Sequence, residues 1–307
     1  MTERLMLLDT ASLYFRAFFG VPDKVKAPDG SSVNATRGLL DIIAKLVTLY
    51  QPSQLIACWD DDWRPQWRVD LIPGYKAHRV VEQVTAAPDV EEVPDALQQQ
   101  IPLIRETLGV LGIPIIGVAE HEADDVIGTL ATRASLPVDI VTGDRDLFQL
   151  VDDSRDVRVI YTARGMSNLE VITDETVVSR YGVLPSQYAD FATLRGDASD
   201  GLPGVKGVGE KTAATLLRAY GDLAGIRAAA AEGQLSATAA ARFADAAAYL
   251  EVAPTVVRVA TDLDISTPGS ARRGLDDADR DAAEALAATW NLGTSMNRAL
   301  SALASGD

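Results

Sequence analysis

The sequence predicts an α/β protein with a mainly parallel sheet, and three observations support this. Short apolar segments alternate with segments of helical periodicity over about the first half of the chain. Three of the apolar segments end at an aspartate, Asp9, Asp60 or Asp144. From about residue 174 onward, helical patterns dominate. Strands alternating with helices favour a parallel sheet covered on both faces, and such sheets bind ligands beyond the carboxyl ends of their strands.

The individual elements follow from the spacing of apolar residues. Short apolar runs predict strands at residues 4–8, 55–59, 113–118 and 138–141. Apolar residues recurring every three or four positions predict helices at 36–50, 95–111, from about 122, after 209, and near 236–250 and 278–290. The stretch from about 61 to 94 interrupts this pattern with prolines and carries most of the local basic charge.

Composition narrows the class of protein. The chain has 307 residues, of which 47% are hydrophobic and 23% charged, as in soluble globular proteins. Its single cysteine, Cys58, excludes an internal disulfide and a cysteine-based zinc site. No apolar run reaches the roughly 18 residues of a membrane span, and the N-terminus lacks the features of a signal peptide. We therefore expect a cytoplasmic protein.

Six further acids lie in three short motifs, at residues 122–125, 143–146 and 196–201. These acids are Glu122, Asp124, Asp125, Asp146, Asp197 and Asp200. Each motif alone also fits a structural role, because acids suit the first turn of a helix, helix N-caps and surface turns. Together with the three strand-end aspartates, however, they form a set of nine acids that we expect to converge at one sheet edge.

A cluster of nine carboxylates needs compensating cations, since neighbouring carboxylates cannot all ionise otherwise. Oxygen ligands without a cysteine cluster favour hard ions such as Mg²⁺ or Mn²⁺. Two such ions about 4 Å apart are the usual arrangement for displacement at phosphorus. The formal net charge of −16 argues against nucleic-acid binding, but setting the nine acids aside leaves −7.

Basic residues lie in two segments suited to phosphates. The glycine-rich loop at 202–213 carries Lys206 and Lys211 and leads into a helix N-terminus, which favours contact with a phosphate, although a plain helix-entry turn has the same composition. In the interrupted stretch, basic residues alternate with Trp63 and Trp67, as in single-strand binding sites, and a solvated loop is the alternative.

Six motifs occur in the order of a known enzyme family and cover roughly residues 4–255. They are Leu8-Asp9 with Phe15-Arg16-Ala17-Phe18, Trp59-Asp60, Gly74 to Arg79, Glu122 to Asp125, Gly143 to Leu147, and Gly196 to Asp200 running into Pro203 to Thr212. On these motifs the chain resembles the bacterial 5′ nucleases, namely the 5′–3′ exonuclease domain of DNA polymerase I and its flap-endonuclease relatives. It carries no polymerase domain, so the resemblance is to a free-standing nuclease.

The resemblance implies an architecture and an activity. The architecture is a PIN-like α/β core at 1–173 with a helical arch at about 61–95, a helix-hairpin-helix region at 174–260, and a helical extension of unassigned role at 261–307. The activity is two-metal hydrolysis of DNA at 5′ flaps, nicks or 5′ ends during replication and repair, leaving a 5′-phosphate. The implied cofactors are Mg²⁺ or Mn²⁺, with K⁺ at the hairpin. We expect a monomer that works beside a separate polymerase and ligase.

The resemblance also implies roles for individual residues. The catalytic residues are Asp9, Asp60, Asp125, Lys76 and Arg79. The metal ligands, direct or through water, are Asp9, Asp60, Glu122, Asp124, Asp125, Asp144, Asp146, Asp197 and Asp200. The expected DNA contacts are Arg16, Arg64, Arg68, Tyr75, Lys76, Arg79, Gly204, Lys206, Gly207, Gly209, Lys211 and Thr212.

Some positions depart from the family pattern, and other functions were open to the same residues. Asp61 and Asp62 follow Asp60 where relatives carry small or basic residues, Phe15 replaces a common tyrosine, and Gly201 replaces a usual asparagine. An aspartyl-phosphate phosphatase needs an acid at the position of Ala11, and RNA-cleaving PIN nucleases are shorter and lack the hairpin. The remaining alternative is a non-catalytic DNA flap or junction binder on the same scaffold.

Overall fold

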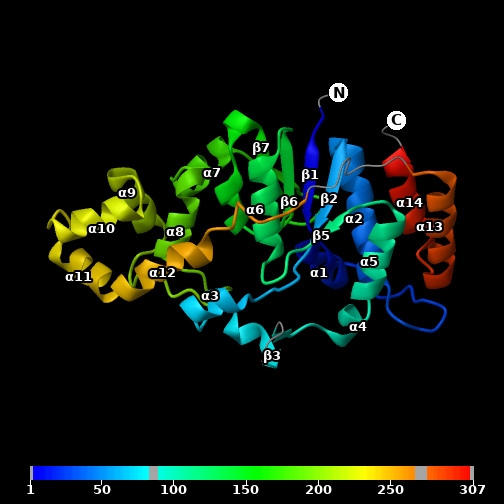
Figure 1. Cartoon of the computed structure of the whole chain (residues 1–307), viewed down its shortest axis with the longest axis horizontal. Coiled ribbons are helices and arrows are strands. Elements are labelled where there is room, and N and C mark those ends of the chain that lie inside the picture. The colour runs from blue at the N-terminus through cyan, green and yellow to red at the C-terminus, as the bar shows by residue number, and fades with distance from the viewer. Residues whose placement is uncertain (1–2, 83–88, 267–274, 305–307) are drawn as a thin grey trace.

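The computed structural model describes residues 3–82, 89–266 and 275–304, and a six-stranded sheet lies at its centre (Figure 1). The strand order is β5-β2-β1-β6-β7-β8. The bounds are β1 Leu5–Asp9, β2 Gln54–Cys58, β5 Ile115–Ile116, β6 Val138–Thr142, β7 Val157–Tyr161 and β8 Glu170–Ile172. All neighbouring strands pair in parallel except β7 and β8, which pair antiparallel. The predicted parallel sheet is confirmed, and β7 and β8 extend it.

Helices cover both faces of the sheet because β1 is apolar on both sides. Met6 and Leu8 enter one core with helices α1 (Thr10–Gly20), α2 (Asn34–Tyr50) and α5 (Ile101–Val110). Leu5 and Leu7 enter a second core with α6 (Ala123–Arg133) and helices from later in the chain. A continuous apolar strand is typical of a parallel sheet that is buried on two faces.

The predicted helix at 95–111 is two helices in the structure, α4 (Asp95–Gln98) and α5. Gln100 lies at the break, and its side-chain oxygen accepts hydrogen bonds from the backbone N–H groups of Ala35 and Thr36 at 2.9 and 3.2 Å. Pro102 stands in the first turn of α5, where a missing N–H has no cost. The break therefore lets a glutamine cap the start of α2.

Residues 61–95, where the sequence implies a helical arch, are described except for 83–88, so that part of the prediction lies outside the described residues. The described part holds one short α-helix, α3 (Gln66–Leu71), and the 3₁₀ turn η1 (Ala77–Arg79). A two-stranded antiparallel pair, β3 (Val80–Glu82) with β4 (Val90–Glu91), follows. This segment passes below the carboxyl edge of the sheet in Figure 1.

The region from residue 174 is helical, as predicted, and projects to one end of the molecule (Figure 1). Its helices are α7 (Asp174–Tyr181), α8 (Tyr188–Arg195), α9 (Glu210–Tyr220), α10 (Leu223–Ala231), α11 (Ala237–Asp245) and α12 (Ala247–Val257). The glycine-rich loop joins α8 to α9. Gly204 and Gly207 in this loop have positive φ, and a Cβ on Gly204 would lie 2.6 Å from the carbonyl oxygen of Arg195. Only glycine therefore fits there.

The last part of the chain belongs to the first core. Helices α13 (Asp277–Trp290) and α14 (Gly293–Ala304) pack against α5 and α2 at the opposite end from the helical region (Figure 1). Met296 and Ala299 of α14 are fully buried in the core that contains α2. The sequence predicted α13 but not α14. None of the helices in the described ranges has the length and hydropathy of a membrane span.

We predict that Met296→Ala lowers the free energy of unfolding by about 2–5 kcal/mol, because it removes a fully buried side chain from between α14 and α2. Leu49→Ala is the matched control on α2, since Leu49 is 57% exposed and its truncation should change stability by no more than about 0.5 kcal/mol. Urea unfolding followed by circular dichroism measures both. Equal losses in the two variants would contradict the placement of α14.

Candidate active site

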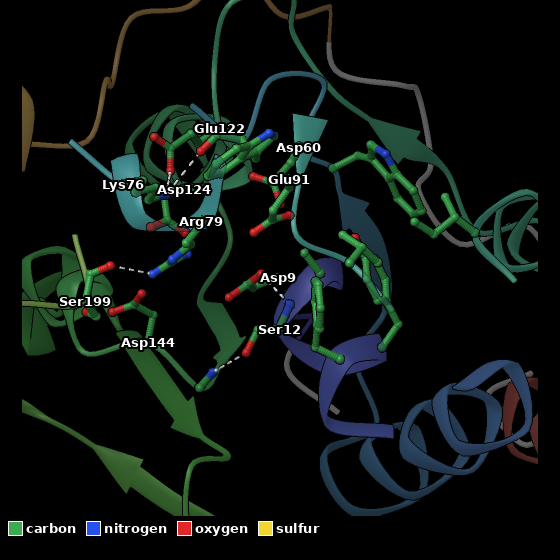
Figure 2. Close-up of a pocket in the computed structure, with 18 of the residues that line it drawn as sticks. Asp9, Ser12, Asp60, Lys76, Arg79, Glu91, Glu122, Asp124, Asp144 and Ser199 are labelled. Carbon is green, nitrogen blue, oxygen red and sulfur yellow. Dashed lines mark hydrogen bonds and ion pairs between the residues drawn. The ribbon is translucent and has the colours of Figure 1, made fainter. Parts of the chain in front are cut away.

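A cavity of about 680 Å³ opens at the carboxyl ends of β1, β2 and β6 (Figure 2). A much smaller recess of about 20 Å³ adjoins it and shares Lys76, Glu122, Asp124 and Asp144 with it. Eight of the nine predicted acids line these two spaces: Asp9, Asp60, Glu122, Asp124, Asp144, Asp146, Asp197 and Asp200. The sequence prediction that these acids converge at one sheet edge is therefore confirmed for eight of them.

Asp9 is held by the first turn of α1 and by β6. Its carboxylate accepts a hydrogen bond from the backbone N–H of Ser12 at 3.2 Å, so it caps α1. The Thr142 hydroxyl donates to its other oxygen at 2.6 Å, and the same hydroxyl accepts from the N–H of Asp144 at 2.8 Å. The hydroxyl of Ser12 accepts from the N–H of Gly143 at 3.0 Å (Figure 2). These bonds fix the end of β1 against the turn after β6.

Asp60 lies against the N-terminus of α6. Its carboxylate accepts from the backbone N–H of Ala123 at 2.7 Å, one of the amides that a helix leaves unpaired at its start. Positive potential at a helix N-terminus favours a carboxylate there. Asp124, in the same first turn, points into the cavity beside Asp60 (Figure 2).

Asp197 and Asp200 approach from the turn after α8. The side chain of Asp197 accepts from the backbone N–H of Ser199 at 2.9 Å and from the Arg195 guanidinium at 3.0 Å. Although burial opposes it, hydrogen bonds from the hydroxyl and the backbone N–H of Ser199, together with the charge of Arg195, lower the pKa of Asp197. Asp200 accepts from Arg79 at 3.3 Å and, with Asp146, lines the small recess.

Five of the acids have pKa values shifted the other way, upward. Burial, followed by the charge of Asp60, raises the pKa of Asp9 to about 7. Burial raises the pKa of Asp60 to about 6 against the hydrogen bond from Ala123, and it raises the pKa of Asp200 to about 6 against the charge of Lys76. Burial and neighbouring carboxylates raise the pKa values of Asp124 and Asp146 well above 3.8. The protein alone therefore does not neutralise this cluster.

The donor set suits a hard divalent cation. All the donors are carboxylate oxygens, which Mg²⁺ and Mn²⁺ prefer, and the raised pKa values of Asp9 and Asp124 reflect negative charge that the surrounding protein compensates only in part. Within the described residues no three acidic, histidine or cysteine side chains form a ready metal cage. The carboxylates instead face one another across the cavity, an arrangement that fits cations bound partly through water.

Lys76 and Arg79 supply positive charge on one side of the cavity (Figure 2). The Lys76 ammonium forms an ion pair with one carboxylate oxygen of Glu122. The other oxygen of Glu122 accepts from the Tyr75 hydroxyl at 2.7 Å and from Arg68 at 3.0 Å. Arg79 donates to the carbonyl oxygen of Ser199 at 2.8 Å, and its side chain is 35% exposed. A phosphate that enters the cavity would therefore meet both cations.

The structure does not bring Asp125 into the cavity. Its side chain is fully buried, and both carboxylate oxygens bind the guanidinium of Arg68, at 2.7 and 2.8 Å. The backbone N–H groups of Ala260 and Glu122 donate to the same carboxylate at 2.8 and 3.2 Å. With its oxygens satisfied by the protein, Asp125 has a geometry that supports a structural role and does not support direct metal ligation.

Three expected DNA contacts also point inward. Arg64 and Arg68 are each only 3% exposed, and Tyr75 is 4% exposed. Arg64 forms an ion pair with Asp89 and donates to the carbonyl oxygens of Pro73 and Tyr75. The geometry therefore does not support contact of these side chains with DNA, because their polar atoms bind the arch segment and α6.

The other expected DNA contacts are accessible. Lys206, Gly207, Gly209, Lys211 and Thr212 are exposed at the loop before α9, whereas Gly204 is buried in its turn. Arg16 of α1 lines a second cavity of about 820 Å³, which shares Ser12 and Phe15 with the carboxylate cavity.

The sequence interpretation missed Ser12, Thr142 and Glu91. The hydroxyls hold Asp9, and Glu91 of β4 adds a further carboxylate to the cavity (Figure 2). The signal for Ser12 was its position three residues after an aspartate that caps a helix. Thr142 reaches Asp9 only because β6 pairs with β1, and no local pattern in the sequence shows this pairing. Of the two unusual aspartates, Asp62 is buried and caps the N–H of Arg64 at 3.0 Å, and Asp61 packs against Gly117.

Comparison with known proteins gives a consistent result. Residues 4–182 match the family described as 5′-3′ exonuclease, N-terminal resolvase-like domain, and residues 183–278 match 5′-3′ exonuclease, C-terminal SAM fold. The chain is 59% identical to a Streptomyces coelicolor protein named 5′-3′ exonuclease, over 97% of this chain and 99% of that one. A Mycobacterium tuberculosis protein of the same name is 49% identical, over 99% and 98%.

Solved structures show the same fold. The flap endonuclease of bacteriophage T5, solved as a pseudo-enzyme-product complex with DNA and metal ions, superposes with a TM-score of 0.62. The match covers 98% of this chain and 99% of that one at 18% identity. At this identity the likeness establishes the fold and leaves the roles of individual residues to the geometry described above.

We predict that Mg²⁺ or Mn²⁺ raises the melting temperature, and more at pH 7.5 than at pH 5. The raised pKa values of Asp9 and Asp60 mean that these groups stabilise the metal-free fold below their unfolded value of 3.8, and this contribution is lost as the pH rises through 6 to 7. A cation offsets the loss by about 2.7 kcal/mol per site at a concentration of about 100 times its Kd. Thermal scans with and without EDTA measure the shift. Asp9→Asn should reduce it, and a shift equal at both pH values would contradict the assignment.

Proposed function

Because the chain belongs to the 5′-3′ exonuclease family, we propose that it is a structure-specific 5′ nuclease that hydrolyses DNA at 5′ flaps, nicks and 5′ ends. The observation that carries the proposal is the convergence of eight carboxylates with Lys76 and Arg79 around one cavity at the sheet edge. A site that only bound DNA would gain nothing from so much negative charge beside a phosphate backbone. The carboxylates favour an enzyme over the non-catalytic flap or junction binder.

The mechanism assigns the acids to metal binding. Seven acids at the cavity and its adjoining recess would hold Mg²⁺ or Mn²⁺: Asp9, Asp60, Asp124, Asp144, Asp146, Asp197 and Asp200. When bound, two such ions supply an activated water and stabilise charge on the leaving oxygen. The residues of the chain position the ions: Thr142 and Ser12 orient the turn that carries Asp144, and the amide of Ala123 orients Asp60.

Lys76 and Arg79 would stabilise the charge of the reacting phosphate. Both line the cavity, and both side chains extend from a turn in which Lys76 itself has a positive φ of 48°. The backbone N–H of Lys76 donates to the carbonyl oxygen of Asp200 at 3.0 Å, so the turn is tied to the acids from the helical region. Because the protein already holds these charges in place, they would stabilise a reacting phosphate without first having to reorient.

The loop between α8 and α9 would bind the duplex on one side of the cut. Lys206 and Lys211 lie exposed at the start of α9, whose N-terminal amides favour a phosphate. The Arg242 guanidinium donates to the carbonyl oxygen of Gly207 at 3.3 Å, so a K⁺ ion in this loop would have to share that carbonyl. A cytoplasmic monomer that acts beside a separate polymerase and ligase completes the proposal.

We predict metal-dependent cutting of a 5′-labelled flap duplex at the junction, abolished by EDTA and by Asp9→Asn. Lys76→Ala should slow single-turnover cutting by about 10²–10³-fold, as removal of one charge-stabilising group does in other enzymes. Lys45→Ala is the control, because Lys45 lies on α2 and donates to the carbonyl oxygen of Met166 away from the carboxylates. Tight flap binding with no product in either metal would instead favour the junction binder.

We also predict that Lys206→Ala and Lys211→Ala weaken binding of duplex DNA of any sequence. Each should lower the slope of log Kd against log salt by about 1, the loss expected for one phosphate contact. Fluorescence anisotropy at several salt concentrations, in EDTA so that no product forms, measures the slope, and Lys45→Ala again serves as the control. An unchanged slope in both variants would place the duplex elsewhere.

A further inference from the structure

Arg68 and Asp125 form a buried ion pair beside the cavity. The two guanidinium nitrogens bind the two carboxylate oxygens at 2.7 and 2.8 Å, and the side chains are 3% and 0% exposed. A planar guanidinium that meets a carboxylate through two parallel bonds fixes the orientation of both groups. Replacing such a pair by apolar residues is often neutral or stabilising, so its burial needs a reason other than stability.

The pair continues into the cavity through Glu122. Arg68 donates to one oxygen of Glu122 at 3.0 Å, the same oxygen that accepts from Tyr75. The other oxygen of Glu122 pairs with the Lys76 ammonium (Figure 2). A series of direct contacts therefore runs from Asp125 through Arg68 and Glu122 to Lys76.

The same pair contacts the chain where it leaves the helical region. The Nε of Arg68 donates to the carbonyl oxygen of Val256 in α12 at 3.2 Å. Three residues after α12 ends, the N–H of Ala260 donates to Asp125 at 2.8 Å. This segment lies against α6, because a Cβ on Gly128 would come within 2.5 Å of the carbonyl oxygen of Ala260. The pair thus joins α3, α6 and the end of α12.

We propose that Arg68 and Asp125 are positioning residues, which hold Glu122 and Lys76 at the cavity and set them relative to the helical region. This inference rests on the proposed nuclease function. If α12 or α3 shifts, the pair loses its bidentate geometry, and Glu122 and Lys76 lose their anchor. Asp125 lines neither space, and Arg68 lines only the small recess, where its guanidinium nitrogens bind Asp125, Glu122 and the carbonyl oxygen of Val256, so their effect on the reaction is indirect.

The test compares Asp125→Asn, Arg68→Lys and the double variant with Asp139→Asn. Asp139 is an equally buried aspartate on β6, bound by Arg4 at 2.9 Å and Arg158 at 2.7 Å, near the opposite edge of the sheet. Its variant also leaves buried charge unpaired, and it controls for general loss of stability. Single-turnover rate, KM, the Mg²⁺ concentration for half-maximal rate, and melting temperature are measured for each protein on the flap substrate.

We expect both single changes at the Arg68–Asp125 pair to lower kcat by about 10–100-fold, the loss that a small misplacement of a catalytic group can cause, with little change in KM. The double variant should be no slower than the slower single variant, because either change already breaks the pair. Asp139→Asn should lower the melting temperature comparably and leave kcat unchanged. The Mg²⁺ concentration for half-maximal rate should change by the same factor in both single variants, or stay unchanged in both.

Other outcomes would overturn the inference. A raised Mg²⁺ requirement in Asp125→Asn alone would make Asp125 a metal ligand after all. An equal loss of kcat in Asp139→Asn would show that the Arg68–Asp125 pair only stabilises the fold. If the double variant lost activity by the product of the two single effects, Arg68 and Asp125 would act independently and not as a pair. A wild-type protein that cuts no 5′-ended DNA would reject the proposed function itself, which is a different result from normal cutting by the variants.

Discussion

Repulsion among carboxylates that share a buried space is the constraint on which the rest of this structure depends. The acids come from five segments of the chain, and the protein compensates several of them in part: amides at the starts of α1 and α6 bind Asp9 and Asp60, the Thr142 hydroxyl binds Asp9, and the guanidinium of Arg195 binds Asp197. The raised pKa values of Asp9 and Asp60 show that these compensations are incomplete. The sheet edge, the helix N-termini and the arch segment are thus parts of one electrostatic arrangement, which the proposed cations would complete.

The convergence of the acids was predictable because it follows from chain geometry. Parallel strands bring their carboxyl ends to one edge, so aspartates at the ends of β1, β2 and β6 had to meet. The direction of individual side chains was not predictable in the same way. Asp124 and Asp125 are neighbours in the first turn of α6, yet a helix turns about 100° per residue, so one faces the cavity and the other faces Arg68. Only the contact with Arg68, which is distant in sequence, shows that Asp125 is the aspartate that faces away from the cavity.

The roles of the basic side chains were equally hard to predict from local sequence. Arg64, Arg68 and Lys76 look alike in a basic, aromatic-rich stretch of sequence, and burial alone separates the two arginines that bind the protein from the lysine at the cavity. The helix α14 was missed for a different reason: Met296, Ala299 and Leu300 do recur at helical spacing, but nothing local shows that they pack on a partner more than 240 positions earlier in the chain. Local spacing carries information about elements, and tertiary contact decides which of their residues act.

The packing of α14 on α2 also affects the order in which parts of the protein can fold during synthesis. The first core stays incomplete until residues 293–304 have been synthesised, since they cover the apolar face of a helix made near the start of translation. Contacts so far apart in sequence form slowly because a long loop must close first. The helical region that would hold DNA therefore leaves the ribosome before the core beneath the catalytic edge is closed. One of the last helices to be made thus completes the packing around one of the first.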